Sequence, residues 1–493
     1  MPYALPTRRR LLRDSTSGST AHRWIGDFST RVSCLEREIM KRPRIAVSRL
    51  AAAVAALAVT ATACSGLNSA SGEQQFSGQT LTVAGTWNGA EGKNFRKVLD
   101  GFTKKTGAKV KFLSSRAQGR DDFALFIRDL RKNGKTPDVA MVPQVGVLQQ
   151  FAQKGWLEPL PPRVELEAAR NFALVWQNYG SVRRIFYGLY FKASHKSTVW
   201  YSPKAFEKAD VEPPKDYKEM IANGQKLADS GTPAFSVAGK DAWPLTDWFE
   251  NIYLAQAGPA NYAKLATNEI GWQDPTVIKA LKTFGKLFKG DDLVAGGGAE
   301  ALRTDLNESV GAVYGKNQKA AMVYEGDFVA GIISGEFNRK VDKEANFFDF
   351  PPIAKDKQAP VISGGDAAVA MKKGKQQEDL AMSFIEYLAS PKAAEIWAKQ
   401  GGFLSPNINL NLQAYPDETT RKVAKSLVDA GEAVQFDMSD QAPADFGGSA
   451  GKGEWQLLQE FIRDPSDPEA TARKLDQAAS KAYLDASATG TAG

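Results

Sequence analysis

Side chains suited to holding a small polyhydroxylated molecule follow three predicted strands of this 493-residue chain. Trp87 and Glu91 come after the strand expected over 80–84, Arg116 follows a second strand, and Gln144 follows a third. The carboxyl ends of parallel strands meet at one edge of a sheet, where open α/β folds bind ligands. An indole can cover the apolar face of a ring, and charged or amide groups can bond its hydroxyls. The pattern predicts a small-molecule site at this edge, although Trp87 would equally suit a half-buried packing position.

The supply of cysteine and histidine restricts the catalysis that this chain could perform. The two cysteines are Cys34 and Cys64, and the two histidines are His22 and His195. From residue 65 onward only His195 remains, which excludes a zinc site of Cys and His, a Cys–His nucleophile pair and an internal disulfide. A Ser-His-Asp triad would have to use His195, which we interpret as a surface or hinge histidine. We therefore predict no catalytic residue, no metal and no cofactor.

The net charge of the chain comes from its first 63 residues. The whole chain carries 63 Lys and Arg against 56 Asp and Glu, a formal net charge of +7. Of these, 11 basic and four acidic residues precede Cys64, so the part that begins at Cys64 carries 52 of each sign. A strongly basic protein would suggest a nucleic-acid partner, but this part is formally neutral. We therefore expect no nucleic-acid binding.

The segment from Met40 to Cys64 has the parts of a secretory signal. A cationic start at Lys41 leads into an apolar run over 50–63, which is shorter than the roughly 20 residues that a spanning helix needs. A cysteine directly after small residues resembles a bacterial lipoprotein signal, in which that cysteine is lipidated. The resemblance departs at Ala61, where such signals prefer leucine. A secretory signal without lipid and a transmembrane helix are the alternatives.

The residues before and after this signal are expected to have no regular structure. Residues 1–39 are polar and have no strand or helix period, so we expect a disordered or untranslated leader, with Met40 rather than Met1 as the true start. Residues 64–78 are rich in Ser, Gly, Asn and Gln and are expected to form a flexible tether. The signal would place the protein on the extracytoplasmic face of the cell membrane, anchored through lipid on Cys64.

The elements that must position the candidate site alternate between strand and helix. Strands are expected over 80–84, 109–113, 138–142 and 367–371, with amphipathic helices after them, and the segment 363–366 precedes the last strand. This alternation predicts an α/β fold with a mostly parallel, doubly wound sheet. The 430 residues from Cys64 onward exceed one ordinary domain and suit two.

Several segments follow one another in an order and spacing that is typical of a known family. They are Pro137-Asp138-Val139, residues 151–160, residues 319–322 with Glu325-Gly326, Ser363-Gly364-Gly365-Asp366, and residues 384–394. Together they make the chain resemble the extracellular solute-binding lipoproteins of bacterial ABC sugar importers, family 1 type. A closer resemblance to the α-glucoside-binding members is carried by residues 87–92, 142–144, 243–248, 401–407 and 436–440. The chain departs from the family at Phe328, where many members have a tryptophan that stacks on the sugar.

The resemblance implies a two-lobed, type II periplasmic-binding-protein-like fold, with the ligand cleft between lobes joined by hinge strands. Lobe one would take 76–187 and 355–408, and lobe two 190–350 and 410–490. Such a protein is a monomer that captures a carbohydrate, here an α-glucoside or another oligosaccharide, and delivers it to the permease subunits by closing its cleft. The ligand-binding residues that it implies are Trp87, Glu91, Arg116, Gln144, Trp243, Asp247, Trp248, Phe328, Gly365 and Asp366.

Two other classes of function remain open from the residues alone. A secreted glycoside hydrolase needs an acid and a base about 5–9 Å apart, and carboxylates such as Asp247 and Glu250 meet that need by type. A binder of a peptide or an anion is the second alternative. The candidate residues contain more acids than bases, which disfavours an anion.

Overall fold

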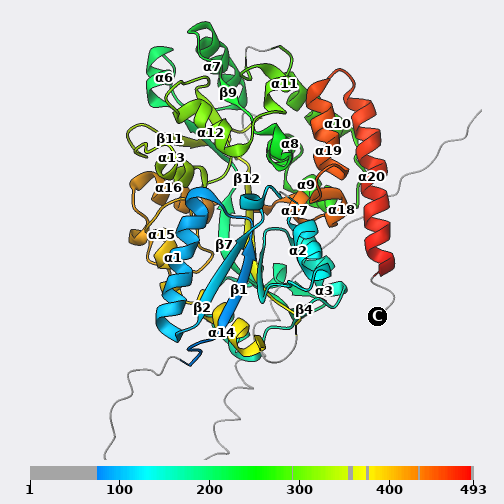
Figure 1. The fold of residues 1–493 in the computed structure, drawn as a ribbon. Helices are drawn as coiled ribbons and strands as arrows, with labels where there is room; N and C mark the ends of the chain where they lie inside the picture. Colours follow the sequence, from blue (N-terminus) through cyan, green and yellow to red (C-terminus); the bar gives the residue numbers. More distant parts are fainter. Residues whose placement is uncertain are drawn as a thin grey trace, which may run out of the picture. The chain divides into compact units, whose positions relative to one another are not determined.

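Two β-sheets organise the described part of the chain. This computed structural model describes residues 75–489 except 121, 291–292, 354–358, 374–376 and 431–433. The predicted leader, the signal, Cys64 and most of the predicted tether lie outside these residues. Figure 1 shows the two sheets and the helices around them. Among the described helices, none combines the length and the apolar character needed to cross a bilayer.

The larger sheet has the strand order β13-β12-β3-β1-β2, with β4 and β7 also paired to β12. Its strands are β1 Thr80–Gly85, β2 Lys109–Ser114, β3 Val139–Val142, β4 Leu157–Glu158, β7 Gly188–His195, β12 Val361–Met371 and β13 Val434–Phe436. β1 is parallel to β2 and β3, whereas β12 is antiparallel to β3, β4 and β7. The α/β class predicted from the sequence is confirmed, but the sheet is mixed, because β12 runs against its neighbours.

Helices cover both faces of the larger sheet because its central strands are apolar on both sides. α1 Gly89–Thr106, α14 Glu378–Leu388 and α15 Pro391–Ala398 pack in one apolar cluster with Leu81, Val83 and Met141. α2 Phe123–Lys132 and α3 Val145–Gln153 pack in another with Ala84 and Val142. The alternating residues of β1 and β3 thus supply the two faces.

The smaller sheet has the strand order β11-β8-β10-β9. Its strands are β8 Thr198–Tyr201, β9 Phe235–Ser236, β10 Met322–Tyr324 and β11 Asn346–Asp349, and α8 Trp243–Ala257 packs beside them with a separate apolar core. The other helices are α4 Pro162–Asn171, α5 Leu174–Tyr179, α6 Pro203–Lys208, α7 Tyr217–Asp229, α9 Pro259–Ala266, α10 Pro275–Lys286, α11 Gly297–Ala301, α12 Leu306–Tyr314, α13 Val329–Gly335, α16 Glu418–Asp429, α17 Met438–Gln441, α18 Ala444–Gly447, α19 Gly453–Arg463 and α20 Pro468–Thr489. Short pieces are the hairpin β5 Ser181–Val182 with β6 Ile185–Phe186, and the 3-10 turns η1 Arg116–Gln118, η2 Gly239–Asp241 and η4 Leu412–Ala414.

Three crossings join the two sheet regions, and backbone hydrogen bonds tie them together. β7 of the larger sheet passes into β8 of the smaller one through Lys196 and Ser197 alone. The Lys196 N–H donates to the Ile362 carbonyl at 2.8 Å, at the start of β12. The Asp437 N–H donates to the Ser363 carbonyl at 2.8 Å, which brings the chain after β13 to the same place. The predicted lobe boundaries stay a prediction, although β13 pairs in the larger sheet from within the range expected for lobe two.

One local expectation is wrong. The segment 363–366 was expected to precede a strand at 367–371, but β12 begins at Val361 and includes it. Its two glycines serve a close approach: a Cβ on Gly365 would lie 2.6 Å from the Lys192 carbonyl oxygen, and one on Gly364 would lie 3.0 Å from Lys196 Cε. Glycine at these two positions therefore lets β12 pass close to Lys192 of β7 and to Lys196 just after it.

Candidate functional site

A cavity of about 100 Å³, the inner cavity, lies at the carboxyl ends of β1, β2 and β3 and faces α8 and α17. Eight of the ten predicted ligand-binding residues line it, namely Trp87, Glu91, Arg116, Gln144, Trp243, Phe328, Gly365 and Asp366. The structure thus brings together residues that are up to about 280 positions apart in the chain, from Trp87 to Asp366. Trp87, Glu91, Arg116 and Gln144 lie together because the loops that follow parallel strands share one edge of the sheet.

Glu91 is held by a lysine that the sequence analysis did not select. Lys192 Nζ donates to Glu91 Oε1 at 2.7 Å, and the two side chains are only 4% and 11% exposed. The same ammonium lies 5.1 Å from the Phe328 ring centroid and 5.9 Å from that of Trp87. Burial would lower the pKa of Lys192, but Glu91 and Asp366 outweigh it and raise that pKa. Lys192 therefore stays charged beneath the aromatic floor of the cavity.

Trp87 itself is mainly a packing residue. It is 3% exposed, and its ring meets those of Phe95 and Trp397 in T-shaped, edge-to-face contacts with centroids 4.6 and 4.8 Å away. Such contacts hold an indole inside an apolar core. Most of the Trp87 side chain therefore packs in the core, as one of the two interpretations of this residue predicted. A small part of the side chain lines the inner cavity.

Asp366 is a buried carboxylate that lines the inner cavity and accepts no hydrogen bond from the described residues. It lies on β12 at a β-bulge: Asp366 pairs with Lys192 and Ala367 with Tyr190, so one residue of β7 is left over. Bulges re-aim side chains beside functional sites. Burial raises the pKa of Asp366 to about 6, partly offset by Lys192. A buried carboxylate that accepts no hydrogen bond from the described residues is suited to accept hydrogen bonds from a ligand's hydroxyl groups.

Asp366→Asn is expected to stabilise the protein without ligand above pH 6. Because the folded-state pKa of about 6 lies above the unfolded value of 3.8, the stability linked to this group is present at low pH and is lost as the pH rises through 6. The ionised group then costs on the order of 1–3 kcal/mol. Melting temperatures measured at pH 4.5 and 8 should show the variant more stable only at pH 8, and the exposed control Asp100→Asn should show no such gain. If wild type and Asp366→Asn melted at the same temperature at both pH values, ionised Asp366 would not lower the stability of the protein, which would contradict the prediction.

Trp243 supplies an aromatic wall from the opposite side of the cavity. The Arg116 guanidinium lies 5.5 Å from its ring centroid and Lys196 Nζ 5.7 Å, so two cations flank the indole. Arg116 follows β2, whereas Trp243 begins α8, and the contact therefore spans the cavity. The residue before it, Ala242, has φ +67° and ψ −51°, a strained conformation for a residue with a Cβ. Such strain often marks functional positions, and here it sets the direction of Trp243.

Asp247 and Trp248 do not line the cavity. Trp248 is 1% exposed and packs against Phe235 and Tyr324 in the core of the smaller sheet. Asp247 is fully buried, and its Oδ1 lies 3.3 Å from Lys196 Nζ. Nearly every residue of α8 is buried, so its apolar pattern could not tell which side faces the ligand.

The sequence analysis missed part of the cavity wall. The additional lining residues include Lys192, Ser194, Lys196, Ser439, Asp440 and Trp455. A signal for Lys192 was present, because a lysine inside an apolar strand is seldom buried unless it is paired. Lys196 and Asp440 meet only through the fold, since 244 positions separate them.

The groups considered for catalysis have structural partners. Glu250 Oε1 accepts the Ser439 N–H at 2.9 Å and its Oε2 the Met438 N–H at 2.8 Å, and neither Glu250 nor Asp247 lines the inner cavity. His195 is buried at the end of β7, where its backbone N–H donates to Asp327 at 2.8 Å. Residues 447–451 spell Gly-x-Ser-x-Gly, but they begin at the last residue of helix α18 and do not follow the strand that a nucleophile elbow requires. Among the described residues no acidic, His and Cys group has metal-ligand geometry.

Comparison with known proteins now defines the class. The fold matches a bacterial solute receptor with an exclusive preference for β-D-galactopyranose, at TM-score 0.70 and 20% identity over 83% of this chain and 99% of that one. It is a two-domain fold of the type II periplasmic binding proteins. The chain belongs to the bacterial extracellular solute-binding protein family, whose model matches residues 86–395.

Two relatives have similar sequences over most of their length. The osmoprotective compounds-binding protein of Synechocystis sp. is 30% identical over 388 residues, covering 78% of this chain and 88% of the relative. The alpha-glucosides-binding periplasmic protein of Rhizobium meliloti is 30% identical over 408 residues, covering 80% and 86%. The family predicted from the sequence is therefore confirmed.

Proposed function

We propose that this protein is the solute-binding component of an ABC importer and that its ligand is a carbohydrate, an α-glucoside or a similar oligosaccharide. The observation that carries the proposal is the pairing of an aromatic wall, Trp243, with a buried carboxylate, Asp366, that accepts no hydrogen bond from the described residues, in one cavity. Sugars present apolar ring faces and many hydroxyls, and they need both kinds of group. The name of the Rhizobium meliloti relative, an alpha-glucosides-binding protein, supports a carbohydrate ligand.

Cleft closure would deliver the ligand to the permease. Arg116 and Trp243 come from opposite sides of the inner cavity and lie in contact. A sugar that bonds both sides at once favours the closed form over the open one, because only that form offers all the contacts. The permease would then recognise the closed form.

The size of the site favours a ligand longer than one sugar ring. The inner cavity of about 100 Å³ has room for on the order of seven to ten waters, which is the scale of one pyranose. A second hollow of about 380 Å³, the outer hollow, shares Glu91, Arg116 and Leu306 with it. Its other walls are mostly polar, with Asn88, Lys240, Asp241, Asp305, Asn307 and Glu336, and none of the described residues that line it is aromatic.

A disaccharide is therefore expected to bind more tightly than its monosaccharide. Calorimetric titration with glucose, maltose and trehalose should give at least one disaccharide an affinity about tenfold or more above glucose, worth about 1.4 kcal/mol. Asn307→Ala in the outer hollow should weaken that disaccharide and leave glucose unchanged. Glucose binding as tightly as both disaccharides would contradict the two-part site.

The function itself is tested by a thermal-shift screen with mono- and oligosaccharides, including maltose, trehalose and sucrose. A binding protein melts at a higher temperature with its ligand, by mass action, and leaves the sugar intact. Release of glucose from maltose would indicate a glycoside hydrolase instead. Stabilisation by amino acids or organic anions, with none from sugars, would indicate a binder of a peptide or an anion.

We further propose that the protein is an extracytoplasmic monomer anchored by lipid on Cys64. The support is the sequence pattern from Met40 to Cys64, together with the extracellular description of the family. An acylated cysteine holds a binding protein beside its permease, and two chains anchor much better than one. Mass spectrometry of the membrane fraction should find a diacylated or triacylated N-terminal Cys64, and Cys64→Ala should release the protein. Recovery of unmodified protein starting at Cys64 would favour a secretory signal without lipid.

A further inference from the structure

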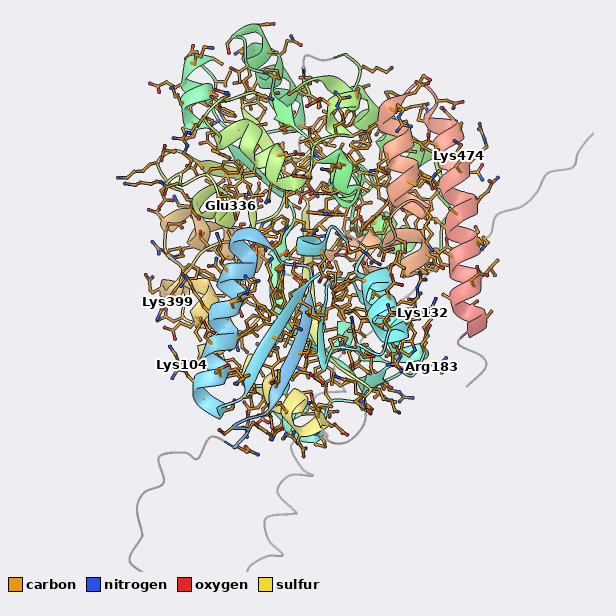
Figure 2. All side chains as sticks on the ribbon, in the orientation of Figure 1. Lys104, Lys132, Arg183, Glu336, Lys399 and Lys474 are labelled. Carbon is orange, nitrogen blue, oxygen red and sulfur yellow. The ribbon has the colours of Figure 1, made fainter. Side chains whose placement is uncertain are left out.

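A buried lysine lies where the crossings between the two sheet regions meet. Lys196 stands between β7 and β8, and its side chain is 11% exposed. Nζ lies 2.5 Å from Asp437, 3.1 Å from Asp440 and 3.3 Å from Asp247. An ammonium has three N–H donors, so this one spends all of them on carboxylates of the protein. The lysines labelled on the outside in Figure 2, such as Lys104 and Lys474, are exposed instead.

The three carboxylates come from two different helices. Asp247 belongs to α8, while Asp440 belongs to α17 and Asp437 caps it. The backbone of Lys196 adds to this connection, because its carbonyl accepts the Tyr324 hydroxyl at 2.8 Å and the Asn251 amide at 2.9 Å. One residue therefore joins α8, α17 and the crossing from β7 to β8.

The same residue borders the inner cavity. Lys196, Ser439 and Asp440 all line it, and Lys196 Nζ lies 5.7 Å from the Trp243 ring. Trp243 and Asp247 lie one turn apart on α8. A shift of α8 away from α17 would consequently displace the aromatic wall together with Asp247.

We infer that Lys196 is a positioning residue for ligand capture: it holds the first turns of α8, with Trp243, against α17 and the crossing strands. The part of this inference that concerns capture rests on the proposed function. Without the ammonium, Asp247, Asp437 and Asp440 face one another in a buried space. Burial already raises the pKa of Asp247, and that of Asp440 to about 7, and those of the three carboxyls that ionise repel one another. Asp437 keeps a pKa lowered to about 2, chiefly because Lys196 outweighs its burial. A neutral residue at 196 removes that compensation and loosens both helices.

Hydrogen–deuterium exchange of the full chain without ligand tests the positioning role directly. Lys196→Met should speed exchange at least tenfold in peptides covering α8 and α17, with little change in α1 and α14. Asp247→Asn removes only the partner on α8, so it should speed exchange there and leave α17 unchanged. Lys282→Met removes an exposed lysine paired with Glu469 and should change neither helix. Unchanged exchange in α8 and α17 of Lys196→Met would overturn the inference.

Titration with maltose tests the connection to capture. Lys196→Met should bind maltose at least 30-fold more weakly than wild type, and Lys282→Met should bind it normally. Maltose binding equal to wild type in Lys196→Met, despite faster exchange in α8, would overturn the role in capture. Wild type failing to bind any sugar would contradict the proposed function, whereas the exchange result would still decide the positioning role. If Lys196→Met does not fold, Asp247→Asn serves instead: exchange in α8 equal to wild type would overturn the inference.

Discussion

Lys192→Met is expected to destabilise the protein by about 3–5 kcal/mol, the range found when one partner of a buried ion pair is removed. The loss leaves Glu91, whose side chain is 11% exposed, without its partner at 2.7 Å, and removes from Asp366 the cation with the largest effect on it. Burial raises the pKa of Asp366 to about 6, so this carboxyl takes up a proton at low pH. The destabilisation measured by urea unfolding should therefore be larger at pH 8 than at pH 5.

A double variant separates the pair from the packing around it. Glu91→Gln combined with Lys192→Met replaces both charges, so it should recover much of the stability that Lys192→Met loses. Methionine also removes the cation–π contacts of the Lys192 ammonium, which lies 5.9, 5.1 and 5.7 Å from the ring centroids of Trp87, Phe328 and Trp397. A cost below about 1 kcal/mol for Lys192→Met would mean that the pair behaves like an exposed one. No recovery in the double variant would mean that the lysine acts through its contacts with the aromatic rings and not through its pair with Glu91.

Trp243→Ala is expected to reduce sugar affinity about 30- to 100-fold, or roughly 2–3 kcal/mol, which is the scale of a central aromatic contact. Its ring is the wall that Arg116 and Lys196 hold in place. The side chain is only partly buried and stands at the cavity. The melting temperature without ligand should consequently change by no more than a few degrees.

Trp156→Ala provides a matched control for this variant. Trp156 is also partly buried and flanked by two cations, with Arg131 at 5.2 Å and Lys154 at 5.1 Å from its ring centroid, but it does not line the inner cavity. Its replacement should leave calorimetric sugar affinity at the wild-type value. Equal losses of affinity in both variants would show that removing any such tryptophan disturbs binding indirectly.

The side of the cavity at the larger sheet could be predicted from the sequence for a simple physical reason. Strands such as β1 and β3 are short apolar runs, and the residues just after them meet at one edge of the sheet. Glu91, Arg116 and Gln144 follow from that rule alone. Phe328 and Asp366 came from the family resemblance rather than from the pattern of residues around them.

The other side of the cavity could not be predicted in the same way. α8 is buried around most of its circumference, so Trp243, Asp247 and Trp248 were equivalent candidates, and only the fold separates them. The role of Lys192 depends on a bulge between β7 and β12, a pairing of strands about 170 positions apart. The segment 363–366 lies outside the strand predicted from the sequence because the reason for its two glycines, close approach to Lys192 and Lys196, is a contact between distant segments.

Asp366 is a buried carboxylate that lowers the stability of the protein at neutral pH, and its place in the cavity suggests why it is kept. Glu91 is paired, but Asp366 stays buried and accepts no hydrogen bond from the described residues. A group that lowers stability at neutral pH persists where function requires it. Under the proposed function, the hydroxyls of a bound sugar would supply the missing donors.

A crystal structure of the complex with the sugar that gives the largest thermal shift tests the central claim most directly. The account predicts one sugar ring in the inner cavity, stacked on Trp243 and with a hydroxyl donating to Asp366. The rest of the ligand should extend past Glu91 and Arg116 into the outer hollow. A sugar bound elsewhere, or one that contacts neither Trp243 nor Asp366, would contradict the account.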